Sequence, residues 1–464
     1  MSDTPSTHRQ AALREIQQAL PALAWTSEPA RVARLSQDFS WFSPVLKGVL
    51  EGKVADAAVR PRDEAELREV VAACARQNVP ITLRGGGTGN YGQATPLHGG
   101  LVIDMSDLKR FAWVRDGVGR AQSGIRLSEF DQHTRAAGWE LRCMPSTFRI
   151  ASLGGLFAGG FGGIGSINYG PLGAAGTILG VSAMTVEPEP RIIELRGAEA
   201  LMQHHAWGTN GIVLEIELAL APAADWSEAI YTFTREADCM AFANQLALAP
   251  GLAKKNICVW LDPIPRYLTR LAEHLPAGQH AVAAVLAPSS LEAARALAES
   301  LGGKQTYEDN TEEATRQNRT VLEYTWNHTT LHVLKEDKGI TYLQVSFTAG
   351  QHLEQVAQVR QAFGDDVMLH LEFIRSMDGQ TTCTALPLLR YQSEAHLNEV
   401  IRRFREMGIR VNNPHVNVVE DGKFGGAVPP EVLALKRRFD PRGLLNPGKL
   451  KSWVQAGVEM AGAQ

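Results

Sequence analysis

The stretch GGGTGNYG, residues 85–92, decides between two ways of folding the first part of this chain. Read from Gly87, it matches G-x-G-x-x-G, the pattern of a nucleotide-binding βαβ unit. An apolar run, VPITLR, precedes it, and Asp104 follows 17 residues after Gly87, near the place of the acidic residue that contacts a ribose in that fold. The pattern alone therefore suggests a site of the NAD type.

The residues after Gly92 exclude that interpretation. A βαβ unit needs a helix at the last glycine, because the N–H groups of its first turn bind the pyrophosphate. Only eight residues, 93–100, separate Gly92 from the next strand, and they include Pro96 and two glycines. No crossover helix fits there. We expect instead a loop whose uncovered backbone N–H groups form an anion-binding nest for phosphate.

A second glycine-rich block follows at residues 145–170. Ten of the 26 residues from Ala151 to Gly176 are glycine. Each glycine costs about 1 kcal/mol of helix propensity against alanine, so we predict no transmembrane helix in this uncharged segment. Small residues let the backbone approach a large ligand closely. A dinucleotide threaded through the fold would use both blocks.

Composition narrows the class of protein. The 464 residues are 44% hydrophobic and carry a formal net charge of −4, which offers no basic field for nucleic acid. The five cysteines lie far apart without C-x-x-C spacing, which is typical of reduced thiols. The first 20 residues contain no apolar stretch before a cleavage site, so we expect a cytoplasmic protein. The length of the chain predicts two or three domains.

Capping residues and periodicity predict the elements around the two blocks. Asp63 caps a helix that ends at Asn78, just before the strand that leads into the first block. A strand of alternating character ends at Pro222. After residue 225 the glycine clusters cease, and alternating helices and strands, including a helix capped by Ser289, indicate an α+β module with one antiparallel sheet.

Six motifs follow one another along the chain: RPRDEAEL, LRGGGTGN, PSTFRIASLGG, NYGPLGAAGTILGVSAMTV, WGTNGIVLEIELAL and FDPRGLLNPGKL. In these motifs and in their order the chain resembles FAD-linked oxidases of the vanillyl-alcohol oxidase and para-cresol methylhydroxylase superfamily, with the glycolate oxidase D-subunit as the nearest type. The resemblance implies an α+β fold in which both chain ends build the FAD-binding domain. The implied divisions are an N-terminal helical segment at 1–54, the FAD-binding domain at 55–225, a cap or substrate domain with an antiparallel sheet at 226–428, and a C-terminal segment completing the FAD-binding domain at 429–464.

The resemblance also implies how FAD is held. The first block would wrap the pyrophosphate, and the second would line the ribityl chain and the ring. Covalent members often carry histidine after the glycines, whereas this chain has Thr88, so we expect non-covalent FAD. Cys143, one residue from the position of a second tether, is expected to be an apolar filler. The implied cofactor-binding residues are Pro61, Arg84, Gly85, Gly86, Gly87, Thr88, Gly89, Asn90, Pro145, Ser146, Ile150, Ser152, Gly154, Gly155, Gly162, Gly163, Asn168, Tyr169, Gly170, Ile212, Asn446 and Lys449.

Candidate catalytic residues come from the cap. It lacks the histidine-rich H-x-G-D-G-N-x-H segment typical of glycolate- and lactate-type members, which weakens a 2-hydroxy-acid assignment. Oxidation of an alcohol needs a base for the hydroxyl proton as hydride leaves for the flavin. His415 or His328 is the candidate base, and Arg390 is a candidate carboxylate clamp. Two further pairs share a strand face: His370 with Glu372, and His415 with Asn417.

His328 and His332 have the spacing of a helical metal pair in WNHTTLH. The glutamate of H-E-x-x-H is missing, however, and the segment is rich in β-forming residues, which argues against a helix. We therefore predict no metal site.

The sequence predicts an FAD-dependent oxidoreductase that oxidises a CH–OH group of a small polar substrate, with a 2-hydroxy acid as one option, by hydride transfer to flavin N5. A second hypothesis, motivated by the missing cap motif, is a non-catalytic or electron-relay flavoprotein subunit of a larger dehydrogenase complex. A third hypothesis, a reductase that takes its electrons from NADPH, finds no support because the sequence contains no second nucleotide-binding motif. The electron acceptor stays open between oxygen, a quinone and a protein partner, as does assembly as a homodimer or a complex subunit.

Overall fold

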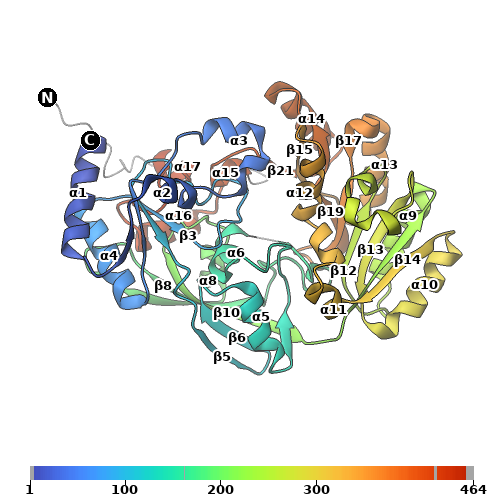
Figure 1. Cartoon of the computed structure of the whole chain (residues 1–464), viewed down its shortest axis with the longest axis horizontal. Helices are drawn as coiled ribbons and strands as arrows, with labels where there is room; N and C mark the ends of the chain where they lie inside the picture. Colours follow the sequence, from blue (N-terminus) through green and yellow to red (C-terminus); the bar gives the residue numbers. More distant parts are fainter. Residues whose placement is uncertain (1–4, 161, 423–425, 456–464) are drawn as a thin grey trace.

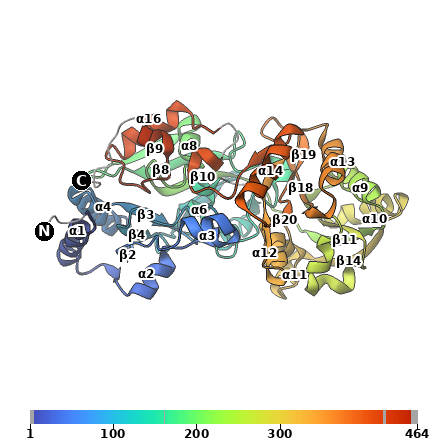
Figure 2. The same ribbon diagram turned by 90° about the horizontal axis from the view of Figure 1, so that it is seen from above.

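A computed structural model describes residues 5–160, 162–422 and 426–455. The chain forms two lobes that lie side by side (Figure 1), and the same division is visible from above (Figure 2). Helices α1 (Pro5–Ala19) and α16 (Pro430–Phe439) lie in the same lobe although they come from opposite ends of the sequence. The fold is of the mixed α+β class that the sequence predicts.

The first lobe begins with a four-stranded sheet in the order β1-β2-β4-β3, in which β1 (Ala24–Thr26) is antiparallel to β2. Strands β2 (Ala57–Arg60), β4 (Leu101–Asp104) and β3 (Ile81–Arg84) are parallel. Helix α4 (Glu64–Gln77) links β2 to β3; Asp63 Oδ1 accepts from Glu66 N at 2.9 Å, and Asn78 ends the helix with φ 53°. Both predicted caps are confirmed. No helix lies between β3 and β4, so the exclusion of a βαβ site is confirmed as well.

A larger antiparallel sheet completes this lobe. Its strands, in the order β5-β6-β10-β8-β9, are β5 (Phe111–Arg115), β6 (Val118–Gln122), β10 (Ile212–Pro222), β8 (Ile178–Met184) and β9 (Ile192–Arg196). Strand β10 ends at Pro222, as predicted. Helices α5 (Leu127–Arg135), α6 (Leu153–Gly159) and α8 (Ala198–Gln203) accompany it.

The C-terminal segment returns to the first sheet. Ile81 N donates to Leu444 O at 2.8 Å, and Asn446 N donates to Ile81 O at 2.7 Å, so these residues extend the sheet beside β3. The turn that leads there is fixed by Asp440, whose carboxylate accepts from the backbone N–H groups of Leu444 and Leu445 at 2.9 and 2.8 Å.

Lys436 opens a run of three basic residues in the last turn of α16. It is buried, and its ammonium forms an ion pair with the buried carboxylate of Asp440. The two residues are one helical turn apart, which lets a cation and its counter-charge be buried together.

Replacing Asp440 with alanine is expected to lower the free energy of unfolding by about 3–5 kcal/mol, because Lys436 would stay buried without its partner. Urea unfolding followed by circular dichroism measures this. Glu199→Ala, which removes an exposed pair with Arg438, is the control and should cost less than about 1 kcal/mol. Equal small losses in both variants would contradict the structural role of the buried pair.

The second lobe is built on an eight-stranded antiparallel sheet. In spatial order its strands are β14 (Lys304–Asn310), β11 (Ser227–Phe233), β13 (His280–Leu286), β12 (Lys254–Trp260), β18 (His370–Arg375), β19 (Thr381–Ala385), β16 (Gln344–Ser346) and β21 (Arg410–Asn412). A small sheet, β15-β20-β17 (Ile340–Tyr342, Leu388–Arg390, Val367–Met368), lies beside it.

The two faces of the large sheet have different neighbours. Ile257 and Val259 of β12 pack with apolar residues of α9 (Glu236–Leu248), α10 (Leu291–Ser300), α13 (His352–Phe363) and α14 (Glu394–Glu406). Cys258 and Trp260, which alternate with them, belong to a core shared with the first lobe. This second face is therefore the one turned toward the glycine blocks.

Two local predictions were wrong. The helix expected from a cap at Ser289 begins at Leu291, because the neighbouring Ser290 uses its hydroxyl to accept from Ala253 N at 2.9 Å. WNHTTLH contributes to a helix, α12 (Asn327–Glu336), since tertiary hydrogen bonds described below outweigh its β-forming residues.

A membrane-spanning helix is not found among the described residues, because none of their helices combines the necessary length with a sufficiently apolar sequence.

Candidate functional site

The two glycine blocks are pressed against each other. A Cβ added to Gly85 would fall less than 3.0 Å from Ser152 Oγ, and one added to Gly86 less than 3.0 Å from the carbonyl oxygen of Ile150. Ser152 itself caps α6, accepting from Gly155 N at 3.1 Å. Side chains at residues 85 and 86 would push the blocks apart, so glycine is needed here for close approach.

The first block presents a row of uncovered donors. In the described structure, no backbone N–H group of residues 85–90 donates a hydrogen bond within the chain. Gly87 has φ +64°, a conformation open to glycine. Consecutive N–H groups in such a turn form an anion-binding concavity. The block therefore fits the phosphates that the resemblance assigns to it.

A buried lysine lies close to the same block. Lys449 Nζ is enclosed, and no hydrogen-bond partner for it exists among the described residues. Burial lowers the pKa of Lys449 to about 7, although the negative charge of Asp38 acts in the opposite direction. A Cβ at Gly89 would lie 3.4 Å from Asp38 Oδ2. An anion bound at the block would give this ammonium the partner it lacks.

The remaining cofactor-binding candidates lie in several settings. Pro61, Pro145, Ser146, Gly163 and Ile212 are buried. Asn168 donates to Lys254 O, and Asn446 donates to Gln93 O and Trp207 O at 2.8 Å. Arg84 donates to backbone carbonyls of Leu35 and Gln37. Ile150, Gly155 and Tyr169 are exposed, while Gly154, Gly162 and Thr88 are partly so.

Cys143 is buried beside Ser166, with Sγ 3.3 Å from the serine Oγ. Burial raises the pKa of its thiol to about 11, despite hydrogen bonds that favour the thiolate. A protonated thiol is a poor nucleophile for a covalent bond to flavin.

The first block also contacts the second lobe. Asn90 Nδ2 donates to Tyr342 Oη at 2.8 Å, and Tyr91 Oη donates to Gln344 Oε1 at 2.6 Å. The predicted phosphate-binding loop is thereby connected directly to the strands of the cap.

His415 uses both ring nitrogens within the protein. Its Nε2 donates to Tyr342 O at 2.7 Å, and its Nδ1 accepts from Ser43 Oγ, also at 2.7 Å. Burial lowers its pKa to about 4, so the ring is neutral at physiological pH. Strand β21 ends at Asn412, so the prediction that His415 and Asn417 share a strand face was wrong; Asn417 lies in the loop after the strand and is half-buried. Neither ring nitrogen of His415 is available to a substrate in this conformation.

Arg390 lies away from these residues. It is exposed on β20, where its guanidinium pairs with Asp337. The structure does not bring this candidate clamp together with the glycine blocks.

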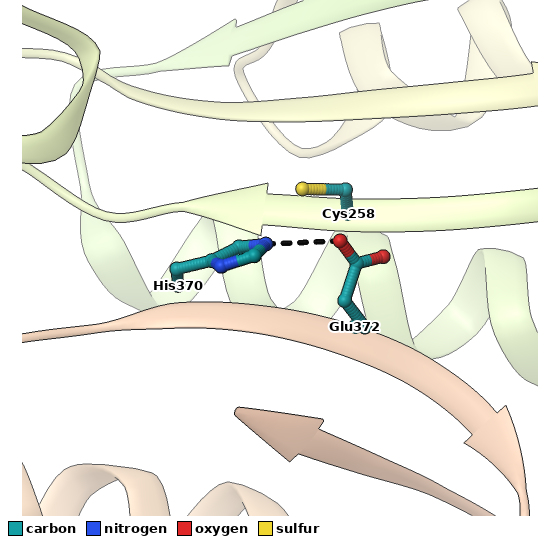
Figure 3. Close-up of side chains that lie close together, drawn as sticks. All are labelled: Cys258, His370 and Glu372. Atoms are coloured by element: carbon teal, nitrogen blue, oxygen red, sulfur yellow. Dashed lines mark hydrogen bonds and ion pairs between the residues drawn. The ribbon is translucent and has the colours of Figure 1, made fainter. Parts of the chain in front are cut away.

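His370 and Glu372 of β18 are fully buried, and Figure 3 shows their side chains close to Cys258 of the neighbouring strand β12. His370 Nε2 donates to Glu372 Oε1 at 2.9 Å, and Trp326 N donates to the same oxygen at 2.6 Å. Asn256 Nδ2 donates to Glu372 Oε2 at 3.2 Å. Both oxygens of the Glu372 carboxylate therefore accept hydrogen bonds from neighbouring N–H groups.

Cys258 completes a trio with His370 and Glu372 whose ligand atoms lie within 4.8 Å of one another, a residue set that could hold a metal ion. Burial, together with the charge of Glu372 and a hydrogen bond to it, raises the pKa of the Cys258 thiol. In the metal-free protein this thiol is therefore protonated at neutral pH.

His328 has a different environment. Its Nδ1 lies 3.2 Å from Glu323 Oε2, while the other oxygen of Glu323 lies 3.3 Å from Arg149 Nε. Burial would raise the pKa of Glu323, but the hydrogen bond from His328 and the charge of Arg149 lower it overall. Among the described residues, Nε2 of His328 has no hydrogen-bond partner. The arrangement resembles a carboxylate-oriented imidazole with one nitrogen left for a ligand.

Sequence reasoning missed Arg149 and Glu323. Arg149 lies within the second glycine block and adjoins Ile150, whose carbonyl oxygen contacts Gly86. Glu323 lies only five residues before His328, which is the one signal that could have found it. Arg149 is 174 residues away from Glu323 in sequence, and nothing local links them.

Comparisons with known proteins identify relatives of part of this chain. Residues 55–194 match the sequence profile of a family described as FAD binding domain. An uncharacterized FAD-linked oxidoreductase of Mycobacterium tuberculosis is 28% identical over 216 residues, covering 44% of this chain and 46% of that protein, so the match spans about half of its length. Glycolate oxidase subunit GlcD of Escherichia coli K12 is 31% identical over 115 residues, covering 24% and 23% of the two chains.

Solved structures show the same fold. An alkyldihydroxyacetonephosphate synthase superposes with a TM-score of 0.69 over 95% of this chain and 84% of that one, at 15% identity. Residues 55–194 of this chain therefore form an FAD-binding domain, and glycolate oxidase subunit GlcD is among the relatives of the chain. The predicted family resemblance and the predicted cofactor FAD are confirmed.

Proposed function

We propose that this protein is an FAD-dependent oxidoreductase that oxidises a CH–OH group of a small polar substrate. Bound FAD would supply the redox step by accepting hydride. The observation that carries the proposal is the juxtaposition of the FAD-binding blocks with His328, through Arg149 and Glu323. We take this continuity as support for a base at the boundary between the two lobes.

His328 is proposed as the base in preference to His415. Its Nδ1–H donates to the Glu323 carboxylate, which fixes the tautomer and leaves Nε2 to receive the substrate hydroxyl proton. Glu323 then stabilises the imidazolium that forms. Arg149 balances the carboxylate charge and holds it in place from the opposite side.

We propose 2-hydroxy acids as the first substrate class to test, because a glycolate oxidase subunit is among the relatives. The purified protein is mixed anaerobically with a panel of 2-hydroxy acids, sugars and phenolic alcohols, and the visible flavin band is followed. Bleaching by a member of the panel is the expected result. Subsequent admission of air reports whether oxygen serves as the electron acceptor.

The alternative function is a relay subunit of a larger dehydrogenase complex. The exposed position of Arg390 leaves the cap without the predicted carboxylate clamp, which favours this alternative. A relay subunit would bind FAD yet bleach with no substrate in the panel, and it would be reduced only by a partner protein.

We also propose that FAD binds without a covalent bond, on the grounds of Thr88 and the buried Cys143 thiol. FAD affinity should then be measurable, and it should depend on Lys449. Phosphate binding nearby would raise the pKa of Lys449 from about 7, so binding above pH 7 must take up a proton. Affinity should be flat below pH 7 and fall by up to about tenfold per pH unit above it.

Lys449→Met should weaken FAD binding and flatten this pH dependence. Fluorescence titration of the FAD-free protein between pH 6 and 9, about the range in which a buried lysine titrates, provides the measurement. Lys451→Met, which alters an exposed lysine paired with Asp421, is the matched control and should keep the wild-type profile. An unchanged profile in Lys449→Met would contradict a phosphate contact.

A further inference from the structure

Trp326 has a backbone conformation that residues with side chains rarely adopt. Its φ is 54° and its ψ is −138°, a region that favours glycine. It directly precedes α12, whose first turn carries His328. Strained residues of this kind persist where the surroundings hold them, and they cluster at functional sites.

Two buried polar residues hold Trp326 from the cap sheet. Glu372 Oε1 accepts from Trp326 N at 2.6 Å, and Asn256 Oδ1 accepts from the indole Nε1 at 3.1 Å. Asn256 Nδ2 also donates to Glu372 at 3.2 Å, which joins the two residues into one unit. Both come from adjacent strands, β12 and β18, and are buried. The backbone and the ring of Trp326 are therefore fixed together.

The first turn of α12 has a second attachment to the same sheet. Thr329 Oγ1 lies 3.2 Å from His370 Nε2 and 3.4 Å from Trp260 Nε1. Its hydroxyl donates to Tyr324 O. Glu372 therefore contacts the chain just before His328, at Trp326, and His370 contacts it just after, at Thr329.

The ring of Trp326 reaches the FAD-binding domain. A Cβ added to Gly162 would lie 3.7 Å from the indole ring, in ordinary van der Waals contact. Gly162 belongs to the second glycine block, which the family resemblance places along the flavin. Trp326 therefore connects the buried polar unit of the cap to the wall of the cofactor site.

We infer that Glu372 and Asn256 are positioning residues for the reaction: they hold Trp326 in its strained conformation, and Trp326 fixes the first turn of α12, so that His328 stays beside Glu323. This inference rests on the proposed function insofar as His328 is the base. It also gives His370 and Glu372 a role behind the site, because both are fully buried and have no exposed surface for a substrate.

The test uses the full-length, FAD-loaded protein with Glu372→Gln. A glutamine has one acceptor and one donor end, so it cannot accept from both Trp326 N and Asn256 Nδ2. We expect the rate constant of flavin reduction at saturating substrate to fall at least about tenfold, while substrate KM and FAD affinity change less than about threefold. An interaction needed only in the transition state gives this split.

Glu228→Gln is the matched control. Glu228 is also a buried glutamate of the cap sheet, but it accepts from Thr320 and Val321 and does not contact Trp326. Its replacement should leave flavin reduction within about threefold of wild type. Trp326→Phe is a second variant, which keeps the backbone N–H bond to Glu372 but loses the hydrogen bond to Asn256 and the outer ring atoms that reach Gly162; it should show the same split.

Hydrogen exchange of the peptide covering residues 321–334 gives a readout that needs no substrate. Faster exchange at Trp326 in Glu372→Gln but not in Glu228→Gln supports the inference. Unchanged exchange, or wild-type flavin reduction in Glu372→Gln, overturns it. If no substrate reduces the wild-type flavin, the proposed function fails, and exchange alone decides whether Glu372 holds Trp326.

Discussion

Replacing Gly86 with alanine is expected to weaken FAD binding by about 100-fold, or about 2.8 kcal/mol. The new Cβ would collide with the carbonyl oxygen of Ile150, which is backbone and has no rotamer with which to move aside. The two glycine blocks would have to separate, and the N–H groups of residues 85–90 would no longer converge on one phosphate. Titration of the FAD-free variant, followed by flavin fluorescence, measures the loss.

Gly48→Ala is the control for this experiment. Gly48 lies in α3 (Pro44–Val49), and a Cβ there meets no atom within 4 Å. Alanine in a helix is favoured over glycine, so FAD affinity and stability should be retained or slightly improved. Wild-type affinity in Gly86→Ala would contradict the fit between the two glycine blocks that the structure describes.

Replacing His328 with alanine is expected to lower the rate constant of flavin reduction by about 10²- to 10⁴-fold, the range for loss of a general base. FAD affinity should be retained, because His328 contacts Glu323 rather than either glycine block. Stopped-flow reduction with the substrate that bleaches the wild-type protein provides the measurement.

His332→Ala is the matched control on the same helix. His332 stacks on Tyr324, and its Nε2 lies 3.1 Å from Glu323 O. Burial lowers its pKa to about 4, so it is occupied and neutral at physiological pH. Its loss should leave flavin reduction within about threefold of wild type. If the two variants behave alike, His328 is not the base.

Local signals predicted the parts of the fold that depend on neighbouring residues. The glycine pattern, the missing helix after Gly92, and the caps at Asp63 and Asn78 are all properties of short stretches. Lys436 could also have been recognised, because its partner Asp440 lies one turn away.

The catalytic candidates depend on contacts that no short stretch encodes. Glu323 meets Arg149 across the two lobes, and His415 meets Ser43 over 372 positions of sequence. Alternation along a strand correctly put His370 and Glu372 on one face, but could not tell that Trp326 and Asn256 would cover that face. In this protein the degree of burial, rather than the type of residue, distinguishes the candidate base from the residues that support it.

The pairing of Ile81 with Leu444 and Asn446 has a consequence for biosynthesis. The sheet that carries the first glycine block is completed by residues made more than 350 positions later. The second lobe is a continuous stretch between them, so it can fold on the ribosome before residues 444–446 are made. The first sheet gains its last pairing only once Asn446 has emerged, so the lobe that carries the first glycine block is completed after the second lobe.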